Sequence, residues 1–124
     1  MDDLLADFIA ETREMLEASG GELVAWEADP GDRARLDAIF RFVHTVKGNC
    51  GFFDFPRLAS LSHAAEDALA DCRAGRREPD QQLVTAVLAI IDRIALMIDA
   101  IEAGEDLASF DPDGSDEALI AGLD

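Results

Sequence analysis

The residues best suited to chemistry lie in one short run near the middle of the chain. Four of them are spaced i, i+3, i+4 and i+7, namely His44, Lys47, Gly48 and Gly51. In a helix this spacing places all four on one face. Glycine inside a helix costs about 0.5–1 kcal/mol relative to alanine, so a face with two glycines beside an imidazole is a poor choice for stability alone. The pattern predicts that another molecule approaches the imidazole closely.

Two more polar residues, His63 and Glu66, lie in the next helical segment. Because the connection between the segments is short, the two helices are expected to pack antiparallel, which lets Glu66, with His63 nearby, approach His44. A carboxylate that accepts a hydrogen bond from Nδ1–H leaves the other ring nitrogen, Nε2, basic and aimed at solvent. Lys47, one turn beyond His44, would offset charge on phosphoryl oxygens. The set suits phosphoryl transfer, which depends on positioning and charge neutralisation.

Each of these residues also has a plainer interpretation. Glu66 could be an ordinary solvated acid on a helix face, and Lys47 could be a surface lysine whose charge contributes little to stability. His63 could be a bystander. Gly48 and Gly51 could allow close helix packing, although both point away from the apolar stripe of their segment.

Helical periodicity runs through most of the chain, and strand signals are nearly absent. Apolar residues predict helices at about 2–27, 33–53 and 56–74, and a fourth that follows Glu78-Pro79-Asp80 and ends at Gly104. Short loops between them predict an all-α, up-down four-helix bundle over residues 1–104. Residues 105–124 form an acidic tail with a short additional C-terminal helix at 116–123, which either docks or frays.

The second predicted helix has an apolar stripe and a polar rim. The stripe contains seven residues: Leu36, Ile39, Phe40, Val43, Val46, Cys50 and Phe53. His44 falls beside the stripe, so its imidazole is expected at the rim of the bundle and partly exposed. Cys50 and Cys72 fall on apolar stripes while His44 and His63 fall on rims, in spacings that match no zinc pattern. We therefore predict no metal site and two cysteines that act as small core residues.

Composition narrows the possible partners. The net charge is −17 and the pI is near 4.1, which repels nucleic acid and anionic lipid, so neither is an expected partner. No apolar stretch is long enough to cross a membrane. The acidic start, Met1-Asp2-Asp3, does not look like a secretion signal, and we expect a cytoplasmic protein.

The run from His44 to Gly51 resembles the signature of histidine phosphotransfer (HPt) domains. A longer resemblance, over about residues 1–103, is to the N-terminal phosphotransfer domain of bacterial chemotaxis kinases of the CheA type. It rests on Met1-Asp2-Asp3-Leu4-Leu5, Phe8, Glu11-Thr12, Phe52-Phe53-Asp54-Phe55 and Leu61-Ser62-His63-Ala64-Ala65-Glu66. Thr45 stands in place of the more frequent serine. Asp54 stands where the family often has glycine, which leaves the end of the second helix open.

The resemblance implies that His44 is phosphorylated, that Glu66 hydrogen-bonds its ring, and that Lys47 and His63 complete the network. It also implies that the phosphoryl group comes from ATP through a separate kinase ATP-binding domain and leaves to an aspartate of a response regulator receiver domain. ATP and Mg would then act on the partner domains. No Gly-rich phosphate loop is present, so this chain is expected to bind no cofactor and to have no independent catalytic activity.

Two other functions fit the same fold. One is a free-standing HPt protein in a multistep relay, which shares the chemistry and differs only in context. The other is a bundle that docks on a response regulator without carrying phosphate. The presence of His44 together with Lys47 and Gly48 argues against the second.

Overall fold

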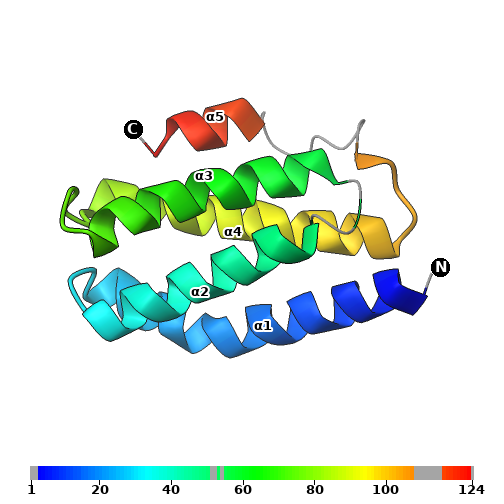
Figure 1. The fold of residues 1–124 in the computed structure, drawn as a ribbon, viewed down its shortest axis with the longest axis horizontal. Coiled ribbons are helices and arrows are strands. Elements are labelled where there is room, and N and C mark those ends of the chain that lie inside the picture. Colours follow the sequence, from blue (N-terminus) through cyan, green and yellow to red (C-terminus); the bar gives the residue numbers. More distant parts are fainter. Residues whose placement is uncertain (1–2, 51–52, 54, 108–115, 124) are drawn as a thin grey trace.

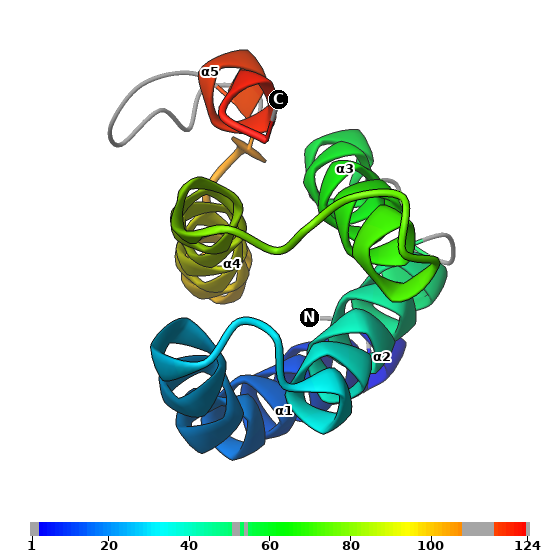
Figure 2. The same ribbon diagram turned by 90° about the vertical axis from the view of Figure 1, so that its left-hand side faces the viewer.

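Helices account for nearly all of the secondary structure. The computed structural model describes residues 3–50, 53, 55–107 and 116–123. Within these residues there are five helices and no strand: α1 (Asp3–Ala28), α2 (Arg33–Cys50), α3 (Pro56–Arg73), α4 (Gln81–Glu102) and α5 (Asp116–Ala121). The first four run alternately in opposite directions, and each contacts two of the others around a ring (Figures 1 and 2). The predicted all-α up-down bundle is confirmed.

The core is the inner stripe of all four long helices. Its largest fully buried side chains are Trp26, Leu36, Ile39, Val43, Leu58, Leu61, Leu69, Leu83, Ile90, Ile94, Met97 and Ile98. α4 contributes most, because it contacts α1 and α3 and also lies under α5. Cys50 and Cys72 are buried free thiols, as expected, and burial raises the pKa of Cys50 to about 11.

Local sequence signals explain where the helices begin and end. The Asp32 carboxylate accepts hydrogen bonds from two backbone N–H groups in the first turn of α2, at 3.0 and 3.3 Å. Asp80 caps α4 in the same way at 2.9 Å. α3 and α4 are followed by glycines with positive φ, 79° at Gly75 and 82° at Gly104. These ends keep the connections short, so α2 and α3 lie antiparallel.

Two expectations about α2 were wrong. The described part of α2 runs to Cys50, and Phe53, predicted to be helical, lies in a turn, where its N–H donates to the Cys50 carbonyl at 3.3 Å. The Phe53 ring instead packs against Phe8 of α1, with centroids 5.2 Å apart. Phe40, predicted for the apolar stripe, packs against the core but is only half-buried, and Phe42, which the predicted stripe left out, is buried. α2 contacts both α1 and α3, so its buried face is wider than one stripe.

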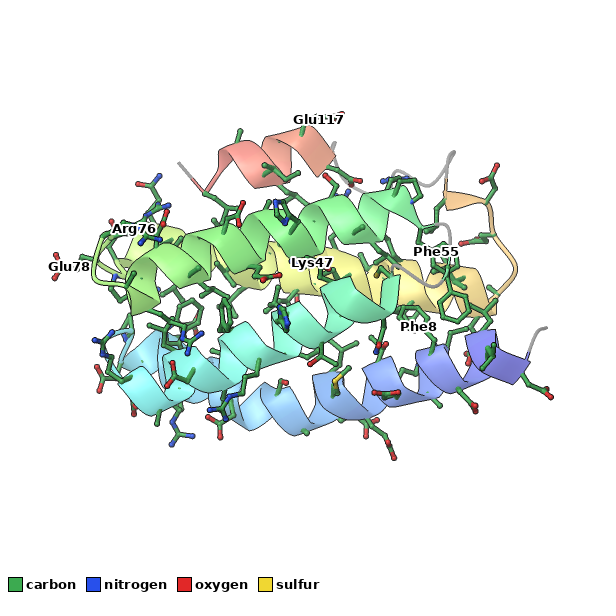
Figure 3. The ribbon with its side chains drawn as sticks, in the orientation of Figure 1. Phe8, Lys47, Phe55, Arg76, Glu78 and Glu117 are labelled. Carbon is green, nitrogen blue, oxygen red and sulfur yellow. The ribbon has the colours of Figure 1, made fainter. Side chains whose placement is uncertain are left out.

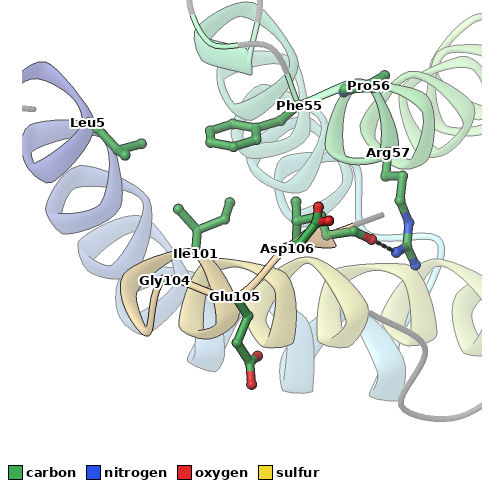
Figure 4. A pocket seen from close by; sticks show the side chains of 9 residues that line it. Leu5, Phe55, Pro56, Arg57, Ile101, Gly104, Glu105 and Asp106 are labelled. Carbon is green, nitrogen blue, oxygen red and sulfur yellow. Dashed lines mark hydrogen bonds between the residues drawn. The ribbon is translucent and has the colours of Figure 1, made fainter. Parts of the chain in front are cut away.

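The short helix α5 docks on the bundle. It contacts α3 and α4 (Figure 2), and Leu123 just beyond it is 5% exposed. Its first residue, Asp116, accepts from Arg57 of α3 at 2.7 and 3.0 Å and from Arg93 of α4 at 3.0 Å. Arg57 also donates to the carbonyl of Leu107, the contact drawn in Figure 4. Since Arg93 is almost fully buried, its charge requires such a partner.

Replacing Asp116 with alanine is expected to lower the free energy of unfolding by about 2 kcal/mol, because Arg93 loses a charged hydrogen-bond partner. The hydrogen bond from Arg57 holds the pKa of Asp116 below its ordinary value of 3.8. The stabilisation is therefore present above that value and is lost as pH falls through the lower, folded pKa. Thermal melts followed by circular dichroism at pH 7 and below pH 3 measure both effects.

Glu117→Ala is the matched control, since Glu117 is the next residue of α5 and is exposed (Figure 3). It should leave the melting temperature unchanged at both pH values. An Asp116→Ala variant as stable as the wild type at pH 7 would show that the ion pairs do not hold α5.

Candidate functional site

His44 and Glu66 face each other across the α2/α3 boundary. The distance from His44 Nδ1 to Glu66 Oε1 is 2.9 Å. The His44 side chain is 61% exposed, whereas that of Glu66 is only 13% exposed. A carboxylate can only accept at this contact, so Nδ1 carries the proton and Nε2 of the neutral ring carries the lone pair. The exposed imidazole thus offers Nε2 as a nucleophile, while the largely buried Glu66 carboxylate binds its other nitrogen, Nδ1.

Lys47 binds the other oxygen of the same carboxylate. Its Nζ lies 2.8 Å from Glu66 Oε2, and Figure 3 labels its side chain where α2 and α3 meet. Burial acts to raise the pKa of Glu66, but the hydrogen bonds from Lys47 and His44 outweigh burial and lower it. Glu66 is therefore a carboxylate at neutral pH. The half-buried Glu66 carboxylate thus contacts both the nucleophile and the cation.

His63 lies elsewhere on α3. Its Nε2 is 3.2 Å from Asp67 Oδ2, four residues further along, and both side chains are more than half exposed. Among the residues that the structure describes, no hydrogen bond joins His63 to His44 or to Glu66. The structure thus brings together three of the four predicted polar residues and pairs the fourth with a neighbour. The i, i+4 acid Asp67 was visible in the sequence as a competing partner.

Gly48 is exposed, and a Cβ atom added there would meet no atom within 4 Å. Nothing within the described part of the chain therefore requires glycine at this position. Its neighbour Thr45 is tied to the helix, since its hydroxyl donates to the Arg41 carbonyl at 2.8 Å. Gly51, the other predicted partner-facing residue, lies outside the described residues. The open space at Gly48 fits a surface shaped for the approach of a partner.

Over the described ranges, no group of three or more His, Cys, Asp or Glu side chains is placed to hold a metal ion. No described helix is both long enough and apolar enough to cross a membrane. The functional groups that the site brings together are the Glu66 carboxylate, the His44 imidazole and the Lys47 ammonium group.

Comparison with known families supports the same chemistry. The family model described as Hpt domain matches residues 3–104, and the chain therefore belongs to the Hpt domain family. Within it, the chain is similar to the chemotaxis protein CheA of Halobacterium salinarum, with 36% identity over 124 residues, which cover 100% of this chain and 18% of that protein. CheA of Treponema pallidum is 31% identical over 103 residues, or 83% of this chain and 13% of the relative. The chain spans less than a fifth of either relative.

Solved structures show the same fold. The CheA phosphotransferase domain from Thermotoga maritima superposes with a TM-score of 0.75 at 30% identity and covers 82% of this chain and 99% of that one. The phosphorylated P1 domain of CheA3 from R. sphaeroides, solved in complex with CheY6, has a TM-score of 0.82 at 26% identity. The match covers 99% of this chain and 94% of that one. The resemblance to CheA-type phosphotransfer domains seen in the sequence is confirmed.

Proposed function

We propose that this chain is the histidine phosphotransfer domain of a chemotaxis-type histidine kinase. His44 accepts a phosphoryl group from the kinase ATP-binding domain and passes it to an aspartate of a response regulator. The observation that carries this proposal is the 2.9 Å contact from His44 Nδ1 to the sheltered Glu66 carboxylate, which leaves Nε2 as the exposed nucleophile. Membership of the Hpt domain family supports it.

Glu66 assists the first transfer through the charge on the ring. When Nε2 attacks phosphorus, an N–P bond forms, the bond from phosphorus to the leaving oxygen breaks, and the ring becomes positively charged. The Glu66 carboxylate, 2.9 Å from Nδ1, stabilises that charge. In the second step an aspartate oxygen attacks phosphorus, the N–P bond breaks, and its electron pair returns to Nε2. The ring is neutral again, and Nδ1 has kept its proton throughout.

Lys47 balances the negative charge that the phosphoryl group brings. It lies one turn from His44 on α2 and already neutralises part of the Glu66 charge through its 2.8 Å contact. A phosphoryl group on Nε2 adds about two negative charges near neutral pH. Without Lys47 these would face the Glu66 carboxylate alone, so the ammonium group lowers the repulsion in the phosphorylated state.

The partners follow from the chemistry and from the relatives. We infer that ATP and Mg are bound by a separate kinase domain and that this chain binds neither. A response regulator as the acceptor is supported by the CheA3 P1 domain, whose structure was solved in complex with CheY6. We also propose a cytoplasmic location, because the chain would have to meet an ATP-dependent kinase core and a receiver domain there. The 18% share of the CheA relative fits a domain that works with others.

The proposal is tested by incubating the chain with a CheA-type kinase core and ATP labelled at the γ-phosphate. The chain should gain label that is acid-labile and base-stable, and should lose it when a CheY-type receiver domain is added. A folded chain that binds the receiver domain yet takes up no label from several kinase cores would support the docking bundle instead.

Adding a methyl group at Gly48 is expected to raise the stability of the fold and to slow phosphoryl transfer. Gly48→Ala should stabilise α2 by about 0.5–1 kcal/mol, since alanine is the better helix former and the site is open within the chain. The methyl group would stand where a partner approaches, so transfer to the receiver domain should slow by at least about fivefold. Melting curves and transfer rates measure the two effects.

Gly21→Ala is the matched control, because Gly21 is also exposed, helical and free of neighbours within 4 Å of an added Cβ, but lies on α1. It should gain stability without losing transfer. An unchanged rate of phosphoryl transfer in Gly48→Ala would show that the partner does not approach closely at Gly48.

A further inference from the structure

The ring of His44 lies against the ring of Phe40, one turn earlier in α2. The two centroids are 6.0 Å apart and the ring planes differ by 9°, a near-parallel stack within the range of favourable aromatic contacts. Residues at i and i+4 are neighbours on a helix surface, so the contact is local and does not depend on a partner. The imidazole therefore has two contacts that restrict it, Glu66 at Nδ1 and Phe40 at its face.

A hydrogen bond at Nδ1 does not by itself fix the direction of Nε2. The ring could pivot about the contact between Nδ1 and Oε1, and a side chain that is 61% exposed has solvent to pivot into. In-line phosphoryl transfer requires the Nε2 lone pair, which lies in the ring plane, to point at phosphorus. The stack on Phe40 opposes this pivot, because tilting the imidazole would break the parallel contact.

Phe40 is in turn held by the end of α3. The guanidinium carbon of Arg73 lies 4.3 Å from the centroid of the Phe40 ring. Arg73 is fixed by two further contacts, since its Nε donates to Asp37 Oδ1 at 2.8 Å and its backbone carbonyl accepts from Arg33 at 3.2 Å. These contacts across the α2/α3 boundary explain why Phe40 stays half-buried at the rim.

We propose that Phe40 is a positioning residue for phosphoryl transfer, whose ring fixes the plane of the His44 imidazole and is itself held by Arg73. This inference rests on the proposed function of His44. A stack of ordinary strength corresponds to about threefold to tenfold in a rate. The loss should fall on the rate at saturating receiver domain and leave KM unchanged.

The test uses two substitutions at Phe40 and one control. Phe40→Leu removes the ring but keeps an apolar side chain, and Phe40→Tyr restores the ring. Phe55→Leu is the matched control, because Phe55 is also half-buried and stacked, on Phe8 at 6.2 Å, but lies apart from Lys47 (Figure 3). Two quantities are measured in each variant: the saturated rate of transfer to a CheY-type receiver domain, and the fraction of His44 in the Nδ1–H tautomer from ¹⁵N chemical shifts.

Phe40→Leu should slow transfer about threefold to tenfold and lower the Nδ1–H fraction, while Phe40→Tyr and Phe55→Leu stay near the wild type. A wild-type rate and tautomer fraction in Phe40→Leu would overturn the inference. Equal losses in Phe40→Leu and Phe55→Leu would also overturn it, since they would reflect general loosening. If the wild type accepts no phosphoryl group, the proposed function fails, and the tautomer fractions still decide whether Phe40 orients the imidazole.

Discussion

Replacing His44 with glutamine is expected to abolish phosphoryl acceptance and to leave the fold intact. The glutamine side chain has no basic ring nitrogen, so no nucleophile remains at this position. Its amide can still donate a hydrogen bond to Glu66, which keeps that carboxylate paired. Because the His44 side chain is 61% exposed, the free energy of unfolding should change by no more than about 0.5 kcal/mol. Uptake of labelled phosphate and circular dichroism measure the two outcomes.

The chain provides a closely matched control in His63→Gln. His63 is also 61% exposed, also lies on a helix and also contacts one acid, Asp67. It should take up label at the wild-type rate, because the structure places it outside the His44–Glu66 contact. Label that persists in His44→Gln and disappears in His63→Gln would move the phosphoryl acceptor to α3.

Replacing Glu66 with alanine is expected to slow phosphoryl transfer by about tenfold to a hundredfold without eliminating it. Nε2 is still present, but the ring loses its partner at Nδ1 and the charge that stabilises the imidazolium. Glu66→Gln separates the two contributions, because its amide oxygen still accepts from Nδ1–H while the charge is gone. The glutamine variant should recover part of the lost rate, in labelling assays at pH 7.

Asp67→Ala is the control for Glu66→Ala. It removes the neighbouring acid of α3, which is 69% exposed and pairs with His63, and should leave the rate unchanged. Wild-type kinetics in Glu66→Ala would exclude Glu66 from the mechanism, even though its carboxylate lies 2.9 Å from the ring.

The sequence was most informative for features that residues of a single helix determine. Periodicity in α2 predicted that His44 lies at the rim, and the short connection before Pro56 predicted that α2 and α3 are antiparallel, which together bring Glu66 near the ring. Capping by Asp32 and termination at Gly75 were also local signals. Each of these depends on residues within a turn or two of one another.

The features that the sequence missed or left open depend on contacts between helices. Periodicity could not decide between Phe40 and Phe42 for the core, because α2 contacts both α1 and α3. The docking of α5 depends on Asp116, which is 59 residues from Arg57 and 23 from Arg93, and no periodic pattern marks such pairs. His63 contacts Asp67, one turn further along α3, and its part in the phosphoryl-transfer network stays a prediction.

The proposed function requires the phosphoryl group to be bonded to Nε2 of His44. The most direct measurement is to phosphorylate the ¹⁵N-labelled chain with a kinase core and to locate the phosphoryl group by tandem mass spectrometry and by long-range ¹H–¹⁵N spectra of the imidazole. We expect a single site, His44, with phosphorus bonded to Nε2 and the proton kept at Nδ1. Phosphate bonded to Nδ1, to His63 or to a hydroxyl oxygen would contradict it.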